Sequence, residues 1–99
     1  MSDKNDRILI ENFTSPDHKH HVDRAKYLAM RDALMQVLPT EPPGLAIADA
    51  RTALLPHLSQ THFPGGEKAG WWLKAVQLDL EAKGVIKRAD KPPVRLYKV

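Results

Sequence analysis

Apolar positions recur with the period of an α-helix in three stretches of the chain. The first carries Tyr27, Met30 and Leu34 on one face, and Pro39 ends it because proline cannot continue a helix. The second ends at Pro56, and the third, which has the strongest pattern, ends at Gly84, a residue type that favours the left-handed backbone after a helix. We therefore expect helices over residues 22–38, 48–55 and 67–83.

Short β-rich runs lie outside these helices. Residues 85–88 and 94–99 flank a polar, proline-containing loop at 89–93, which predicts a C-terminal hairpin. Ile8 to Ile10 is a weak strand candidate, and Leu45 to Ile47 is too short to classify by period. The pattern predicts a mainly α protein with a small β-hairpin, of class α+β, with an N-terminal arm at 1–21 and one domain at 22–99.

The order of these elements resembles the winged helix-turn-helix. Leu80 to Arg88 resembles the junction between the recognition helix and the wing in many bacterial winged-helix proteins, where Leu-x-x-x-Gly-hydrophobic-Ile is common. The resemblance covers 22–99 and implies three helices plus a C-terminal wing, with DNA binding and transcriptional regulation as the expected role. One departure is the connector at 59–66, which has eight residues where a helix-turn-helix usually has three or four.

The whole chain also resembles a family of small bacterial proteins that carries no assigned activity. The shared strings are Pro-Pro-Gly-Leu, at residues 42–45, and Phe-Pro-Gly-Gly-x-Lys-Ala-Gly-Trp-Trp, at residues 63–72. This similarity implies the same fold and no particular function.

The helix expected at 67–83 carries two apolar stripes. The first stripe matches a core-facing side and consists of Ala69, Leu73, Val76 and Leu80. The second stripe lies on roughly the opposite side and consists of Trp71, Ala75, Leu78 and Ala82. Because a helix that is apolar on two faces is normally covered on both, we expect Ile8, Ile10 or Phe13 to cover the second stripe, within one chain or across a dimer.

Three interpretations of Trp71 remain open at this stage: a core position under the arm, a protein or dimer interface, and stacking on bases. Residues 67–83 hold three acidic and three basic side chains, so the helix is neutral overall. Carboxylates are repelled by phosphate, and we therefore expect this helix to be a poor conventional reader of DNA. Trp71, Leu78, Ile8 and Ile10 are the candidate interface residues.

The total charge of the 99 residues is only +3, but it is unevenly distributed. Residues 83–99 hold six cations against one carboxylate, whereas residues 1–82 hold nine basic residues against eleven acidic ones. A basic wing can contact phosphates, although lysines also protect a solvated edge strand from aggregation. The candidate nucleic-acid-binding residues are Lys83, Lys87, Arg88, Lys91, Arg95 and Lys98, together with Lys74 of the preceding helix.

Other functional classes find little support. The chain has no cysteine, and Gly65, Gly66 and Lys68 lack the spacing of a phosphate-binding loop. The histidines at 18, 20 and 21 lie on an expected loop, which is more often solvated than metal-binding. We expect no enzyme, no cofactor, no metal and no membrane contact, find no sign of a small-molecule substrate, and expect a cytoplasmic protein because residues 1–7 are polar. DNA, a protein partner or a second copy remain the candidate partners.

Overall fold

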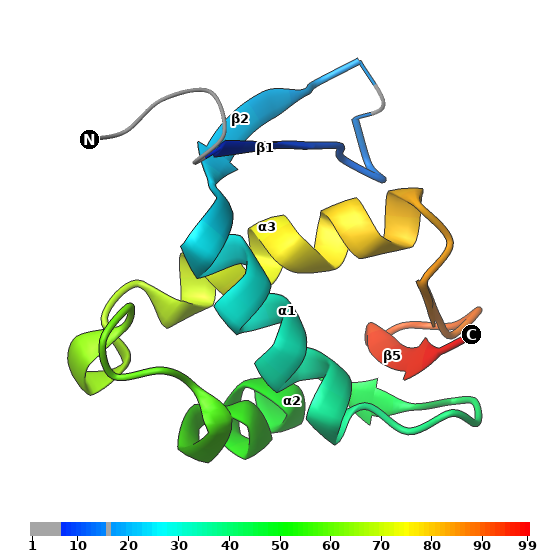
Figure 1. Ribbon diagram of the computed structural model, residues 1–99. Coiled ribbons are helices and arrows are strands. Elements are labelled where there is room, and N and C mark those ends of the chain that lie inside the picture. The colour runs from blue at the N-terminus through cyan, green and yellow to red at the C-terminus, as the bar shows by residue number, and fades with distance from the viewer. Residues whose placement is uncertain (1–6, 16) are drawn as a thin grey trace.

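Three α-helices form the body of the protein (Figure 1). The computed structural model describes residues 7–15 and 17–99, so residues 1–6 of the expected arm lie outside the described residues. The helices are α1, Arg24–Val37, α2, Ile47–Leu54, and α3, Ala69–Ala82. All three predicted helices are confirmed, with ends that differ by one or two residues. The Asp23 side chain sets the start of α1, because it accepts a hydrogen bond from the Lys26 backbone N–H at 3.0 Å.

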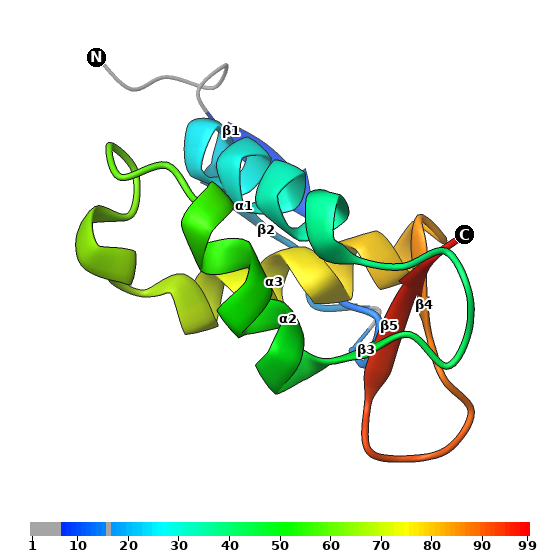
Figure 2. The ribbon, with the colours of Figure 1, turned by 90° about the horizontal axis from the view of Figure 1, so that it is seen from below.

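Two small antiparallel sheets accompany the helices. The N-terminal hairpin pairs β1, Arg7–Ile10, with β2, His20–Asp23. The second sheet joins β3, Leu45–Ala46, β4, Ile86–Arg88, and β5, Arg95–Lys98, in the order β3-β5-β4 (Figure 2). The protein is therefore an α+β fold of three helices, an N-terminal hairpin and a C-terminal three-stranded sheet. We call β4, β5 and their connecting loop the wing.

Sequence patterns did not predict two of these strands. The histidines at 20 and 21 are expected on a loop, but His20–Asp23 is the partner strand of β1 and spans the boundary expected after residue 21. Leu45–Ala46 pairs with Arg95 and Leu96, about fifty residues away. A two-residue strand has no measurable period, and only its distant partner makes it a strand.

The hydrophobic core lies between the helices and the inner face of the C-terminal sheet. Its fully buried side chains include Met30, Leu34, Leu54, Val76, Ile86 and Leu96. Ile10 and Val22 of the N-terminal hairpin join the same core, so the hairpin is packed against the body of the protein. Ile8, which we expected to cover the second stripe of α3, packs at the edge of this core and is only partly buried.

The long connector between α2 and α3 is anchored by Phe63. This side chain is 1% exposed and meets the Trp72 ring edge to face, with 6.1 Å between ring centroids. Two short 3₁₀ turns, Leu55–His57 and Pro64–Gly66, shape the rest of the connector. The additional connector residues thus contribute a large side chain to the core.

Gly44 allows the chain to approach the C-terminal sheet closely. Its φ is +89°, and a Cβ built on it would lie 2.1 Å from the Leu96 carbonyl oxygen. Only glycine fits both the left-handed backbone and this close contact. The Pro42-Pro43-Gly44 turn thereby places β3 beside β5.

Candidate nucleic-acid interface

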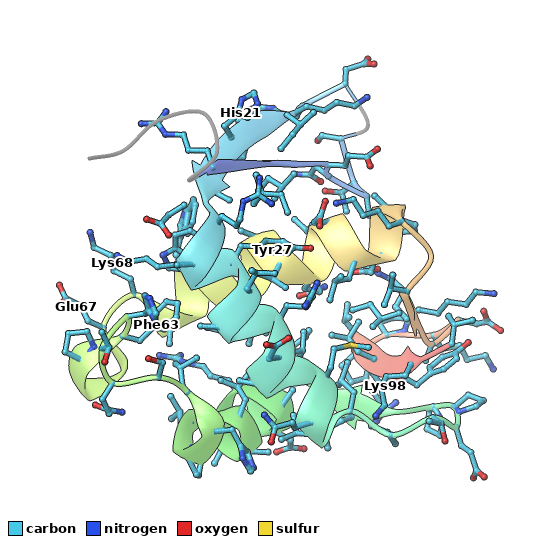
Figure 3. All side chains as sticks on the ribbon, in the orientation of Figure 1. His21, Tyr27, Phe63, Glu67, Lys68 and Lys98 are labelled. Carbon is cyan, nitrogen blue, oxygen red and sulfur yellow. The ribbon has the colours of Figure 1, made fainter. Side chains whose placement is uncertain are left out.

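Asp79 is a fully buried carboxylate in the C-terminal half of α3. It accepts hydrogen bonds from the Tyr27 hydroxyl of α1, from the Glu11 backbone N–H at 2.8 Å, and from Lys83 Nζ at 3.0 Å. Tyr27 is labelled in Figure 3. Burial raises the pKa of Tyr27, and the hydrogen bond to Asp79 raises it further, so this hydroxyl stays protonated. Asp79 therefore links α1, α3 and the chain that follows β1.

Glu81 forms a second buried link, between α3 and the wing. Its side chain is 1% exposed and accepts hydrogen bonds from Gln77 Nε2 at 2.7 Å and Arg88 Nη2 at 2.9 Å. The hydrogen bond to Glu81 raises the pKa of Arg88. The Arg88 guanidinium carbon also lies 5.1 Å from the centroid of the Phe13 ring, a cation–π contact with the arm. Arg88 is thus fixed between the arm and α3.

These contacts change the interpretation of the charge on α3. We expected its neutral sum to weaken phosphate binding, but Asp79 and Glu81 are buried and paired with cations. The third carboxylate, Glu67, precedes α3 and lies at the end away from β5, as Figure 3 shows. The exposed surface of α3 itself carries no unpaired carboxylate.

The seven candidate nucleic-acid-binding residues fall into two groups. Lys83 and Arg88 pair with the buried carboxylates, and Lys98 donates from Nζ to the Met35 carbonyl oxygen at 3.0 Å. The side chains of the other four make no hydrogen bond or ion pair within residues 7–15 and 17–99, and they are Lys74, Lys87, Lys91 and Arg95. The basic tail is therefore partly structural.

The cations of the wing also divide between two faces of its sheet. Lys87 is paired with Tyr97, whereas Arg88 is paired with the fully buried Leu96. Since successive side chains of a strand point to opposite faces, Lys87, Arg95 and Tyr97 share the outward face and Arg88 points inward, toward α3. The six cations of residues 83–99 do not form one continuous surface.

Trp71 is the most exposed aromatic residue of α3, with 55% of its surface accessible. It packs edge to face on Trp72, with centroids 5.1 Å apart. Among the described residues of the arm, Phe13 meets the second stripe at Leu78, which is 8% exposed and whose carbonyl accepts from the Phe13 N–H at 3.2 Å. Within one chain, the described part of the arm thus covers this stripe at Leu78 and leaves Trp71 exposed, because Asp79 holds Glu11 over the last turns of the helix. Cover of Trp71 across a dimer stays a prediction.

A recess of ≈ 470 Å³ lies between α2, α3, the wing and the chain after β1. Three cations line it: Arg51 of α2, Lys74 of α3 and Arg88 of the wing. Among the sequence candidates it gathers Lys74, Arg88 and Leu78 and leaves the outward-facing lysines of the wing elsewhere. Arg51 was missed, because nothing in a short helix shows that one of its side chains will face another helix 19 residues further on.

Gly70 explains why Arg51 fits there. A Cβ built on Gly70 would lie 3.7 Å from the Arg51 Cζ, so the guanidinium rests almost directly on the backbone of α3. Arg51 and Lys74 are both exposed, and their side chains make no hydrogen bond or ion pair to any described residue. The recess therefore presents two uncompensated positive charges at its rim, beside the neutral Arg88–Glu81 pair.

The histidines after β1 do not gather a ligand set. Across residues 7–15 and 17–99, no three His, Cys, Asp or Glu side chains are placed to hold a metal ion. The His18 and His20 rings meet edge to face, with centroids 6.3 Å apart, and His21 projects from β2 (Figure 3). None of the described helices has the length and apolar content needed to cross a bilayer.

Comparison with known proteins places the chain by family alone. No curated protein and no solved structure matches it. A family of unknown function, DUF6958, matches residues 7–96, a range that contains all three helices and every residue of the recess. The chain belongs to the DUF6958 family.

Proposed function

We propose that the protein is a winged helix that binds DNA through the exposed half of α3 and the wing. The element order supports the fold: helix, short strand, two helices and a two-stranded wing. The short strand between α1 and α2 pairs with β5, which joins it to the wing in one sheet. A role in transcriptional regulation would follow from such binding.

The observation that carries the proposal is the pair of free cations, Arg51 and Lys74, beside the wing. They lie on two different helices and converge at one recess on the exposed side of α3. Unpaired Arg and Lys side chains on adjacent elements suit contacts to successive phosphates, which position a protein on a duplex without reading its sequence. Trp71, exposed one residue after Gly70, adds an aromatic surface at the same end of the helix.

The test is fluorescence anisotropy with labelled random duplex DNA at two salt concentrations. If the five free cations Arg51, Lys74, Lys87, Lys91 and Arg95 contact phosphates, log K should fall with log salt with a slope of about −4.5. The double variant Arg51→Gln/Lys74→Gln should reduce the slope by about 2. Arg31→Gln is the matched control, because Arg31 already pairs with Asp32 on α1. Absent binding at low salt, or a slope near zero, would contradict the proposal.

A second candidate function is a protein-interaction or dimerisation module that does not bind DNA. Trp71 favours it, because an exposed tryptophan on a rigid helix is a common anchor of protein interfaces. Light scattering decides between the two candidates: a dimer that dissociates on Trp71→Ser and ignores DNA supports this second function. A monomer that binds DNA with steep salt dependence supports the first.

A further inference from the structure

The recess between α2, α3 and the wing has a lining that phosphate contact does not explain. Beneath the cations its lining is largely apolar, with Ile47, Leu73, Leu78 and Val94. A phosphodiester is polar throughout and gains nothing from an apolar floor. A recess of ≈ 470 Å³ falls within the range of roughly 300–1,000 Å³ that is typical of small-molecule sites.

The charges at the rim indicate what the recess would accept. Arg51 and Lys74 are free and positive, and no carboxylate lines the recess. Arg88 is already held through its Nε and Nη2 by Glu81, which lies behind it. A ligand here meets two uncompensated cations above an apolar surface, with Thr14 and Gln77 as the neutral polar neighbours.

We propose that this recess binds a small amphipathic carboxylate, an organic acid with a flat or branched apolar body. The carboxylate lies between the Arg51 guanidinium and the Lys74 ammonium, where charge-assisted hydrogen bonds are strongest. The apolar body covers Leu73 and Val94, beside the Gly70 backbone on which the Arg51 guanidinium rests. The proposal does not rest on DNA binding, and its test contains no DNA.

The probe is 2-naphthoate, titrated into the full-length ¹⁵N-labelled protein and followed by NMR. We expect saturable shifts of the Gly70, Lys74 and Val94 amides at submillimolar concentration. Two matched probes separate the contributions: 2-naphthamide keeps the body without the charge, and acetate keeps the charge without the body. Each should bind at least about tenfold more weakly, because each loses one of the two contributions. Inorganic phosphate tests for an anion site without an apolar requirement.

Variants test the location. Arg51→Gln and Lys74→Gln each remove one exposed cation and should lower the affinity for 2-naphthoate by roughly tenfold. Lys87→Gln, on the outward face of the wing, is the matched control and should bind like the wild type. Gly70→Leu fills the recess and should abolish binding, whereas Gly70→Ala, whose Cβ meets Arg51 only at ordinary contact distance, should bind.

Several results would overturn the proposal. Equal affinity for 2-naphthoate and 2-naphthamide would show that the cations do not select a carboxylate. Equal affinity for phosphate would show that the apolar floor does not contribute. Binding that survives Gly70→Leu in a protein with an unchanged far-UV spectrum, or shifts confined to residues outside the recess, would place the ligand elsewhere. Because Arg51→Gln and Lys74→Gln lie at exposed positions, they remain informative even if Gly70→Leu does not fold.

Discussion

The two halves of α3 differ in the burial and pairing of their polar side chains. From Val76 to Glu81 every residue is buried, and both carboxylates of this half are paired with cations. From Gly70 to Ala75 the helix exposes Trp71 and Lys74, and Lys74 has no partner within the described residues. The summed charge of a helix therefore says little about the charge of its surface, because buried ion pairs can neutralise half of its charged side chains.

The arrangement of neighbours explains the division. The chain after β1 and the start of the wing both meet the last turns of α3, the first through Asp79 and the second through Glu81. The first turns meet α2 through Gly70 and Arg51, and their outer side stays open. One half of the helix thus holds the fold together, and the other half keeps Trp71 and Lys74 exposed.

The largest effect is expected for Asp79→Ala. The change leaves the Tyr27 hydroxyl and the Glu11 N–H without their buried acceptor and leaves Lys83 unpaired, which should lower the free energy of unfolding by about 3–5 kcal/mol. Urea denaturation measures it. Asp90→Ala removes an exposed carboxylate of the wing loop and should change stability by less than about 0.5 kcal/mol. A loss below about 1 kcal/mol for Asp79→Ala would contradict the structural role of this half.

Arg88→Gln should cost about 2–3 kcal/mol. It leaves Glu81 buried with only the Gln77 amide as a partner and removes the cation–π contact with Phe13. Lys87→Gln, one residue earlier and on the outward face, should be nearly neutral. Similar losses for the two variants would show that the inward and outward faces of the wing do not differ as the strand register indicates.

Tyr27→Phe should lower the free energy of unfolding by about 1–2 kcal/mol at neutral pH. It should also change how stability depends on pH in the alkaline range. Burial and the Asp79 hydrogen bond raise the pKa of Tyr27 in the folded protein, while the unfolded chain ionises near its ordinary value of 10.0. The contribution is therefore fully present below about pH 10 and is lost as pH rises above it.

Urea midpoints of the wild type and Tyr27→Phe should accordingly converge between about pH 9 and pH 11.5. Tyr97→Phe, on the outward face of β5, is the matched control. Its free energy of unfolding should fall at alkaline pH as much as that of the wild type. A constant difference between the wild type and Tyr27→Phe across this range would contradict the role of the buried hydroxyl.

The smallest effect is expected for Trp71→Ser, at less than about 1 kcal/mol, because the lost contact is one exposed edge-to-face pair. Its neighbour provides the comparison: Trp72 is 7% exposed and packs on Phe63, so Trp72→Ser should cost about 3 kcal/mol or more. Thermal unfolding of both variants measures the two losses of stability. Comparable losses would show that Trp71 is a core residue and not a free surface.

Much of the fold could be predicted because its signals are local. The helical period of Tyr27, Met30 and Leu34 and the stop at Gly84 predicted α1 and the end of α3 to within two residues. The candidate site was predicted only in part. Lys74 and Leu78 line the recess, but Arg51 was overlooked and Lys87 faces away from it. The direction of a side chain relative to a second element depends on packing, which period and charge do not encode.

The sequence by itself determined the three helices, the C-terminal hairpin and the excess of positive charge after residue 82, because each depends on residues close in the chain. Folding places Asp79 and Glu81 inside as links, brings Arg88 onto Glu81, and joins Arg51 with Lys74 at one recess. Asp79 meets Tyr27 and Glu11 across 52 and 68 residues. Such pairs form only when folding brings distant segments together, and burial then makes their charges structural.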